Sequence, residues 1–147
     1  MYKILIVDDE SIEREGISFL IEKYKLPLEV AQATNGKTAL EYMRTHPIDI
    51  LLTDVKMPQM DGLELARHTF EKYPDVRILV FSAYGEFEFA KKAMAAQAVS
   101  YLLKPIEVDE FQRVMAQILA RCDELAEKKK DEQQRGEEYR QQLYSAL

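Results

Sequence analysis

Four short apolar runs in the chain each end in side chains that can take part in chemistry. In chain order these side chains are Asp8 with Asp9, Asp54, Ser82, and Lys104. Clustered carboxylates favour a hard divalent cation, whereas a lysine and a hydroxyl can contact a phosphoryl group through charge and hydrogen bonds. These residue types therefore predict a site for a metal ion and a phosphoryl group, provided that the fold brings the four run ends together.

The four runs have the character of buried strands. They cover residues 4–7, 48–53, 78–81 and 99–103. Parallel strands covered on both faces consist of nearly continuous apolar residues, and an open sheet of such strands binds its ligand at their carboxyl ends. We therefore expect all five polar side chains at one edge of one sheet.

Helical segments alternate with these strands. Residues 28–33 are expected to form a further strand, and a first helix is expected to be capped by Ser11. Four helices are expected over 12–24, 38–44, 63–73 and 86–97, and a last one begins near Val108. Five such units predict an α/β fold: a flavodoxin-like doubly wound five-stranded parallel sheet in the order 2-1-3-4-5, with five helices, the last of them extended.

The composition excludes several kinds of protein. The 147 residues are 47% hydrophobic, which suits one well-filled domain, and the net charge of −6 argues against direct nucleic acid contact by this segment. No apolar stretch approaches the roughly 20 residues that cross a bilayer. The single cysteine, Cys122, rules out an internal disulfide and fits a reducing compartment. With no signal peptide evident, a cytoplasmic protein without a membrane association is expected.

The C-terminal segment follows a different pattern. Its apolar residues step by four and three, as in a heptad seam. The seam contains Phe111, Met115, Ile118, Cys122 and Leu125, then the poor seam residues Lys129, Glu132 and Gly136, and then Tyr139, Leu143 and Ala146. Two interpretations stay open: a helix that frays after Leu125, or an extended helix that forms a coiled coil in a homodimer. We divide the chain into a domain at 1–120 and a charged helical linker at 121–147.

The three carboxylates suit a magnesium ion. Asp8, Asp9 and Asp54 would repel one another and raise their own pKa values unless a cation joins them. Oxygen ligands without thiolate or imidazole are those that Mg²⁺ prefers. The alternative is that a strand-end acid such as Asp9 only stabilises the start of the following helix. That alternative explains one acid better than it explains three convergent ones.

Asp54 is the expected nucleophile, because a carboxylate can attack phosphorus to form an aspartyl phosphate. Lys104 would supply a compact positive charge and Ser82 a hydrogen bond. Each of these two could instead be an ordinary solvent-facing residue at a strand end. Pro105 leaves open whether the peptide bond after Lys104 is cis or trans. Tyr101, three residues earlier, is either a packing residue or one that changes rotamer when Ser82 moves.

These residues resemble those of the receiver domains of bacterial two-component response regulators. The matching motifs are Ile4–Glu10, Thr53–Gly62, Ser82–Ala83 and Tyr101–Pro105, within a match of about residues 2–120. The resemblance implies that Asp54 accepts phosphate from a sensor histidine kinase. It implies a Mg²⁺ site made by Asp8, Asp9, Asp54 and the backbone carbonyl of Lys56. It further implies that Ser82 and Tyr101 form a switch pair and that Lys104 contacts the phosphate.

The stretch from Phe81 to Lys91, together with Lys56, resembles receivers joined to an AraC-type helix-turn-helix output domain. A regulatory switch in transcription, not an enzyme, is therefore expected. A phosphatase of the haloacid dehalogenase class is an alternative, but it usually places its two aspartates two residues apart after the first strand. A phosphorylation-independent interaction module is a third hypothesis, and failure to modify Asp54 would favour it.

Overall fold

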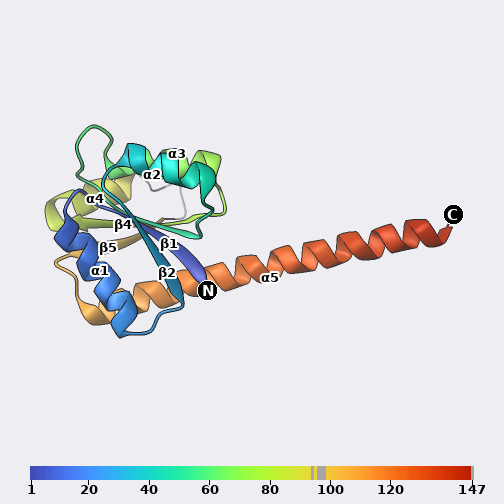
Figure 1. Cartoon of the computed structure of the whole chain (residues 1–147). Coiled ribbons are helices and arrows are strands. Elements are labelled where there is room, and N and C mark those ends of the chain that lie inside the picture. The colour runs from blue at the N-terminus through green and yellow to red at the C-terminus, as the bar shows by residue number, and fades with distance from the viewer. Residues whose placement is uncertain (94, 96–98, 147) are drawn as a thin grey trace.

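A five-stranded parallel sheet forms the centre of the molecule (Figure 1). The structure is a computed structural model and describes residues 1–93, 95 and 99–146. The strand order is β2-β1-β3-β4-β5, which confirms the predicted doubly wound topology. The strands are β1 (Tyr2–Val7), β2 (Leu28–Ala33), β3 (Ile50–Asp54), β4 (Arg77–Ala83) and β5 (Val99–Lys104).

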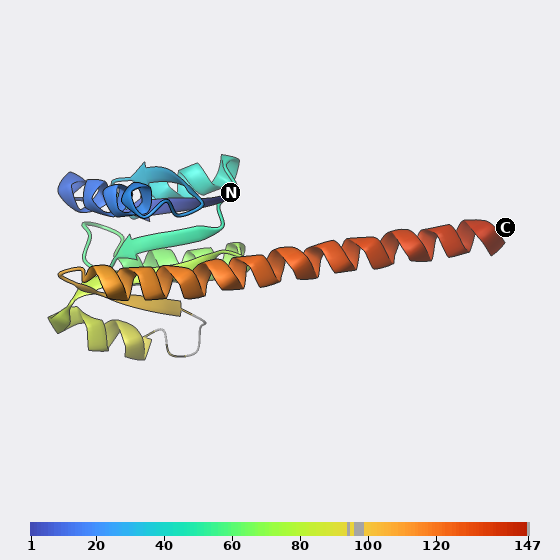
Figure 2. The ribbon, with the colours of Figure 1, turned by 90° about the horizontal axis from the view of Figure 1, so that it is seen from below.

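Helices cover both faces of this sheet. They are α1 (Ser11–Lys23), α2 (Gly36–Thr45), α3 (Gly62–Lys72), α4 (Tyr84–Ala93) and α5 (Val108–Ala146). One core lies between the sheet and α1 with α5, which Figure 2 shows on the near side of the sheet. Two further clusters join the other face to α2, α3 and α4. Alternate residues of the central strands point into the cores on opposite faces of the sheet. Both sets of residues are apolar, so these strands are buried along their length.

The starts of the first two helices differ from the predicted ones. The expectation that Ser11 caps α1 is wrong, because Glu10 holds the N-cap position and makes no capping bond with its side chain. The Oδ1 atom of Asp8 accepts a hydrogen bond from the Glu10 amide at 2.9 Å, which orders this loop instead. Before α2, the Asn35 side chain accepts a bond from the Thr38 amide at 2.8 Å. The helix therefore begins at Gly36, directly after this cap.

The boundaries of α3 and α4 also shift slightly. Asp61 caps α3 by accepting a hydrogen bond from the Glu64 amide at 2.8 Å, and the helix begins at Gly62. Helix α4 follows β4 without a loop and begins at Tyr84, before the predicted start at Glu86. The predicted end of this helix, at Gln97, lies outside the described residues.

The register of the strands brings the functional run ends to one edge. Val7 pairs with Thr53 across β1 and β3, and Asp54 pairs with Phe81 across β3 and β4. Ser82 in turn lies opposite Leu103 of β5. The residue after β1, the last residue of β3 and the ends of β4 and β5 therefore lie at the same level of the sheet.

Helix α5 extends far beyond the sheet (Figures 1 and 2). Its 39 residues continue without a break through residue 120 to Ala146, so the helix does not end after Leu125. The buried residues of α5 are Phe111, Val114, Met115, Ile118 and Cys122. In the part of the chain that the structure describes, no helix is long and apolar enough to cross a membrane.

Candidate functional site

Three carboxylates converge at the carboxyl edge of the sheet. Each of Asp8, Asp9 and Asp54 offers an oxygen atom, and these atoms all lie within 4.8 Å of one another. Asp8 and Asp54 are 2% and 8% exposed, whereas Asp9 is exposed. The predicted convergence of the three acids is present. Their hard oxygen donors at this spacing fit a magnesium ion, with the exposed side left for water or a substrate.

Lys104 lies directly against the two buried acids. Its Nζ atom is 3.3 Å from Oδ2 of Asp54 and 3.4 Å from Oδ2 of Asp8. The peptide bond between Lys104 and Pro105 is cis, which settles the alternative that the sequence left open. The same Nζ atom lies 4.9 Å from the centre of the Phe81 ring, a contact that sequence reasoning missed. The lysine is thus a partner of the acids and not a surface residue.

Burial disfavours the charged forms of the acids in the site. Burial raises the pKa of Asp8 and of Asp54, and the nearby Lys104 only partly opposes this effect. Burial alone would lower the pKa of Lys104, but the two carboxylates outweigh it and raise that pKa. Lys104 therefore does not fully compensate the negative charge of the two buried acids, as expected for a cluster that binds a cation.

The loop after Asp54 approaches the strand end closely. The amide of Gly62 donates to the Val55 carbonyl at 2.8 Å. A Cβ atom placed on Gly62 would lie 1.8 Å from the backbone oxygen of Asp54, far inside van der Waals contact. Gln59 adopts a φ of 69°, in the left-handed region, within the same loop. Gly62 therefore allows the loop to close over Asp54, a requirement that the sequence did not reveal.

Ser82 and Tyr101 lie on the neighbouring strands β4 and β5. Ser82 is fully buried, and its Oγ atom has no hydrogen-bond partner among the described residues. A buried hydroxyl without a partner is uncommon, because it loses its bonds to water. Tyr101 is half-buried and contacts Phe87 edge to face, with 6.0 Å between ring centroids. Burial raises the pKa of the Tyr101 phenol.

Two further residues border the acidic cluster. The Lys56 side chain is 85% exposed, and its Nζ atom lies 3.9 Å from Oε1 of Glu86. The role of the Lys56 carbonyl as a metal ligand stays a prediction. Arg14, which sequence reasoning missed, donates from Nη1 to the Asp8 carbonyl at 2.6 Å. Its helical position and charge gave no signal that it would reach back to the strand end.

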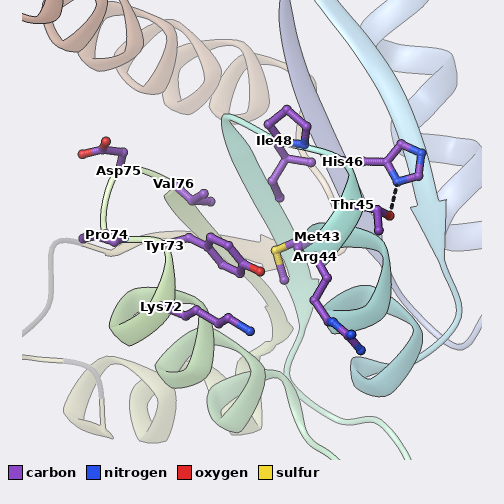
Figure 3. Close-up of a pocket in the computed structure, with 11 residues that line it drawn as sticks. Met43, Arg44, Thr45, His46, Ile48, Lys72, Tyr73, Pro74, Asp75 and Val76 are labelled. Atoms are coloured by element: carbon purple, nitrogen blue, oxygen red, sulfur yellow. Dashed lines mark hydrogen bonds between the residues drawn. The ribbon is translucent and has the colours of Figure 1, made fainter.

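A pocket lies at the opposite edge of the sheet and contains none of the predicted site residues. It has a volume of about 450 Å³ and is formed where α2 and α3 end and β3 and β4 begin (Figure 3). Arg44 and Lys72 line it and carry the positive charge of the last turns of their helices. Positive side chains at these positions offset the dipoles of the two helices, which accounts for Arg44 and Lys72 without a bound ligand.

The structure thus defines a doubly wound α/β domain. At the carboxyl ends of its strands it holds three acids, a buried hydroxyl and an opposing lysine. Residues 4–116 match the model of the response regulator receiver domain. Because this match spans most of the chain, the chain belongs to the response regulator receiver family. The predicted resemblance is confirmed, and phosphorylation-activated switching is the general function of this family.

Similar proteins include transcriptional regulators. The chain is 41% identical over 121 residues to the transcriptional regulatory protein YesN of Bacillus subtilis, covering 82% of this chain and 33% of YesN. It is 31% identical to the transcriptional regulatory protein DegU of Brevibacillus brevis, covering 78% of this chain and 50% of DegU. The chain therefore spans a third to a half of the length of these relatives.

Solved structures of receivers show the same fold. A two component transcriptional regulator AraC from Clostridium phytofermentans superposes with a TM-score of 0.78 and 35% identity, covering 84% of this chain and 97% of that one. The receiver domain of AraT from Geobacillus stearothermophilus gives a TM-score of 0.73 and 38% identity, covering 87% and 98%. The predicted similarity to AraC-type receivers is therefore confirmed.

Proposed function

We propose that Asp54 accepts a phosphoryl group from a sensor histidine kinase and that this chain acts as a signalling switch. The observation that carries the proposal is the cluster itself: the Asp54 carboxylate lies 3.3 Å from the Lys104 ammonium and beside Asp8 and Asp9. This arrangement offers a nucleophile, a positive charge for the incoming phosphate and oxygen ligands for a cation. Asp8 and Asp9 are adjacent after β1 and the proposed nucleophile ends β3, whereas phosphatases of the haloacid dehalogenase class usually place two aspartates two residues apart after the first strand, so we favour a switch over a turnover enzyme.

The chemistry assigns a separate part to each residue. A carboxylate oxygen of Asp54 attacks phosphorus while the bond from phosphorus to the kinase histidine nitrogen breaks, and that nitrogen keeps the electron pair. Lys104 lies within reach of the new phosphoryl oxygens and offsets their charge. Asp8, Asp9, Asp54 and the Lys56 carbonyl would hold Mg²⁺, which when bound neutralises the phosphoryl charge.

Ser82 and Tyr101 are proposed to carry the switch. The unpartnered Ser82 hydroxyl is a ready hydrogen-bond donor for a phosphoryl oxygen on Asp54, one strand away. Movement of Ser82 toward that oxygen would free space for Tyr101 to turn inward from its contact with Phe87. The surface made by α4 and β5 would change as a result.

The output is proposed to be transcriptional and AraC-type. This rests on the similarity to transcriptional regulators and on the AraC-type receiver structure. We propose a receiver followed by a charged helical linker that makes no direct nucleic acid or membrane contact, and truncation within α5 tests the boundary at residue 120 that the sequence indicated. The single cysteine, Cys122, suits the reducing cytoplasm, where we place the protein.

We also propose that two copies pair through the C-terminal part of α5.

Phosphate uptake tests the assignment of Asp54. The wild-type chain and Asp54→Asn are incubated with Mg²⁺ and acetyl phosphate, and the mass of each intact protein is measured. The wild type should gain one hydroxylamine-labile phosphoryl group, and Asp54→Asn should gain none. Asp131→Asn, which changes an exposed acid on α5, is the matched control and should behave like the wild type. Uptake by Asp54→Asn at the wild-type rate would disprove the proposal.

A further inference from the structure

Helix α5 stays attached to its own receiver as far as Lys129. The Tyr2 hydroxyl donates a hydrogen bond to Asp123, and this bond raises the pKa of Tyr2 to about 12, so the phenol remains a donor. Six residues further along the helix, Nζ of Lys129 lies 2.9 Å from Oδ2 of Asp75, in the segment before β4. Among the described residues, Lys129, a poor seam residue in the sequence, is therefore the last residue of α5 with a hydrogen bond or ion pair to the receiver.

Beyond Lys129 the helix leaves apolar side chains in solvent. Residues 130–146 make no hydrogen bond or ion pair with the receiver within the described residues. They extend for roughly 25 Å at about 1.5 Å per residue. Tyr139 is 63% exposed, Leu143 50% and Tyr144 76%. A lone helix of this length is marginal in water, and pairing is the usual way to stabilise it.

The exposed stripe faces a different direction from the receiver. The buried residues of α5 that face the sheet are centred between Phe111 and Cys122. With about 100° of turn per residue, the stripe made by Tyr139, Leu143 and Ala146 is rotated from them by roughly 80°. A second helix on that stripe would therefore pass beside the receiver instead of colliding with it.

We infer that two copies of this chain pair in parallel and in register through the outer part of α5, beginning only after Lys129. This inference rests on the proposed pairing and adds its face, its direction and its starting point. The pairing stripe contains Glu132, Gly136, Tyr139, Leu143 and Ala146. A Cβ atom added to Gly136 would meet no other segment of the described chain within 4 Å, so a partner helix can approach closely there. The apolar members of the stripe all lie in its second half, so a parallel pair in register places Tyr139, Leu143 and Ala146 against the same residues of the partner.

The register has a consequence for charge. In a parallel pair, a residue just before one seam position contacts the partner's residue five positions later. Arg135 of one copy therefore faces the partner's Arg140, and the same repulsion occurs twice in the pair. Such like charges weaken the interface, so salt should strengthen the pairing. An antiparallel pair would not bring these two arginines together.

Charge reversal tests this register. The dimer dissociation constant is measured by analytical ultracentrifugation for wild type, Arg135→Glu, Arg140→Glu and the double variant. Each single change replaces repulsion by attraction at two symmetric places and should tighten the dimer by roughly fivefold. The double variant restores repulsion, now between glutamates, and should lose that gain. Lys130→Glu, the same charge change on the opposite side of the helix, should leave the constant unchanged.

Disulfide crosslinking tests independently which side of α5 faces the partner helix. Leu143→Cys should crosslink two copies rapidly under mild oxidation, whereas Gln141→Cys, on the opposite side, should do so slowly. Equal rates, or a dimer that ignores the arginine changes, would overturn the parallel register while leaving pairing itself intact. Monomers at every concentration, including for Arg140→Glu, would overturn both. Neither result depends on phosphorylation of Asp54, so failure of the pairing and failure of the proposed phosphoacceptor remain distinguishable.

Discussion

The ammonium nitrogen of Lys104 lies 3.3 Å from Oδ2 of Asp54, across the sheet from β5 to β3. Strand β4 runs between the two, so this ion pair ties together strands that share no backbone hydrogen bonds. The lysine also contacts Asp8, which makes it a shared partner of both buried acids. Among the described residues, Lys104 is the one side chain that forms an ion pair with either buried acid, so the charge balance of the metal-free site depends mainly on it.

Replacement of Lys104 should destabilise the metal-free protein. Lys104→Ala leaves two buried carboxylates without a cation, and we expect a loss of about 1–3 kcal/mol near neutral pH. The loss should shrink at acidic pH, where the carboxyls take up protons. Urea unfolding in EDTA at both pH values measures the difference, with Lys130→Ala as the exposed control. Equal losses at both pH values would show that packing, not charge, is the cause.

The free energy of unfolding in EDTA should fall as the pH rises through the acidic range. Asp8 and Asp54 have raised pKa values in the folded chain, so the folded state binds their protons more tightly than the unfolded state does. Their stabilising contribution is present below the unfolded pKa and is lost as the pH passes the folded pKa. Asp54→Asn should flatten this dependence. Thermal unfolding against pH measures it, and a rise in stability over the same range would contradict it.

Magnesium should oppose that loss near neutral pH. A ligand that binds only the folded state stabilises it by about 2.7 kcal/mol at a hundredfold excess over its dissociation constant. The increase in Tm should be smaller at acidic pH, where protons compete for the carboxylates. Asp9→Ala should reduce the increase and abolish phosphate uptake, as should EDTA. Phosphate uptake that is unchanged in EDTA would remove the cation from the proposed mechanism.

Removal of the Ser82 hydroxyl should separate phosphate uptake from switching. Ser82→Ala removes a buried hydroxyl that has no hydrogen-bond partner among the described residues, so the stability of the variant should be unchanged or higher by about 1 kcal/mol. The variant should still be phosphorylated on Asp54 but should not shift Tyr101. Backbone NMR with and without beryllofluoride measures this at Phe87 and Tyr101. A wild-type response in Ser82→Ala would exclude Ser82 from the switch.

The sequence predicted the site because most of its functional residues end or directly follow an apolar strand run. In a parallel sheet, that position alone brings Asp8, Asp54 and Lys104 to one edge. Contacts that depend on three-dimensional approach could not be predicted in this way. The close passage of Gly62 over Asp54 and the reach of Arg14 to the Asp8 carbonyl leave no periodic pattern.

The seam of α5 shows a similar limit. A spacing of three and four continues through Lys129 whether the helix faces a partner or its own receiver. The ion pair with Asp75 shows that at Lys129 it faces the receiver. The boundaries of α1 and α4 were also misplaced, because loop hydrogen bonds and a direct strand-to-helix connection decide them.

Two glycines should respond to alanine in opposite ways. Gly62→Ala forces the loop away from the Asp54 backbone oxygen, and we expect a loss of about 2–4 kcal/mol together with slower phosphate uptake. Gly16→Ala adds a methyl group inside α1 with nothing within 4 Å, and should stabilise by about 0.5–1 kcal/mol. Urea unfolding of the two variants compares them directly. Equal effects would show that helix propensity or general packing governs both positions.

Truncation within α5 should show where the receiver ends. A chain cut after residue 129 keeps the buried Cys122, the bond from Tyr2 to Asp123 and the ion pair from Lys129 to Asp75. Its free energy of unfolding should match that of the full chain at concentrations where no dimer forms. A chain cut after residue 120 loses all three and uncovers Ile118, so it should be less stable by about 2–4 kcal/mol. Urea unfolding and phosphate uptake of both fragments test this, since equal stability would place the end of the receiver at residue 120, as the sequence indicated.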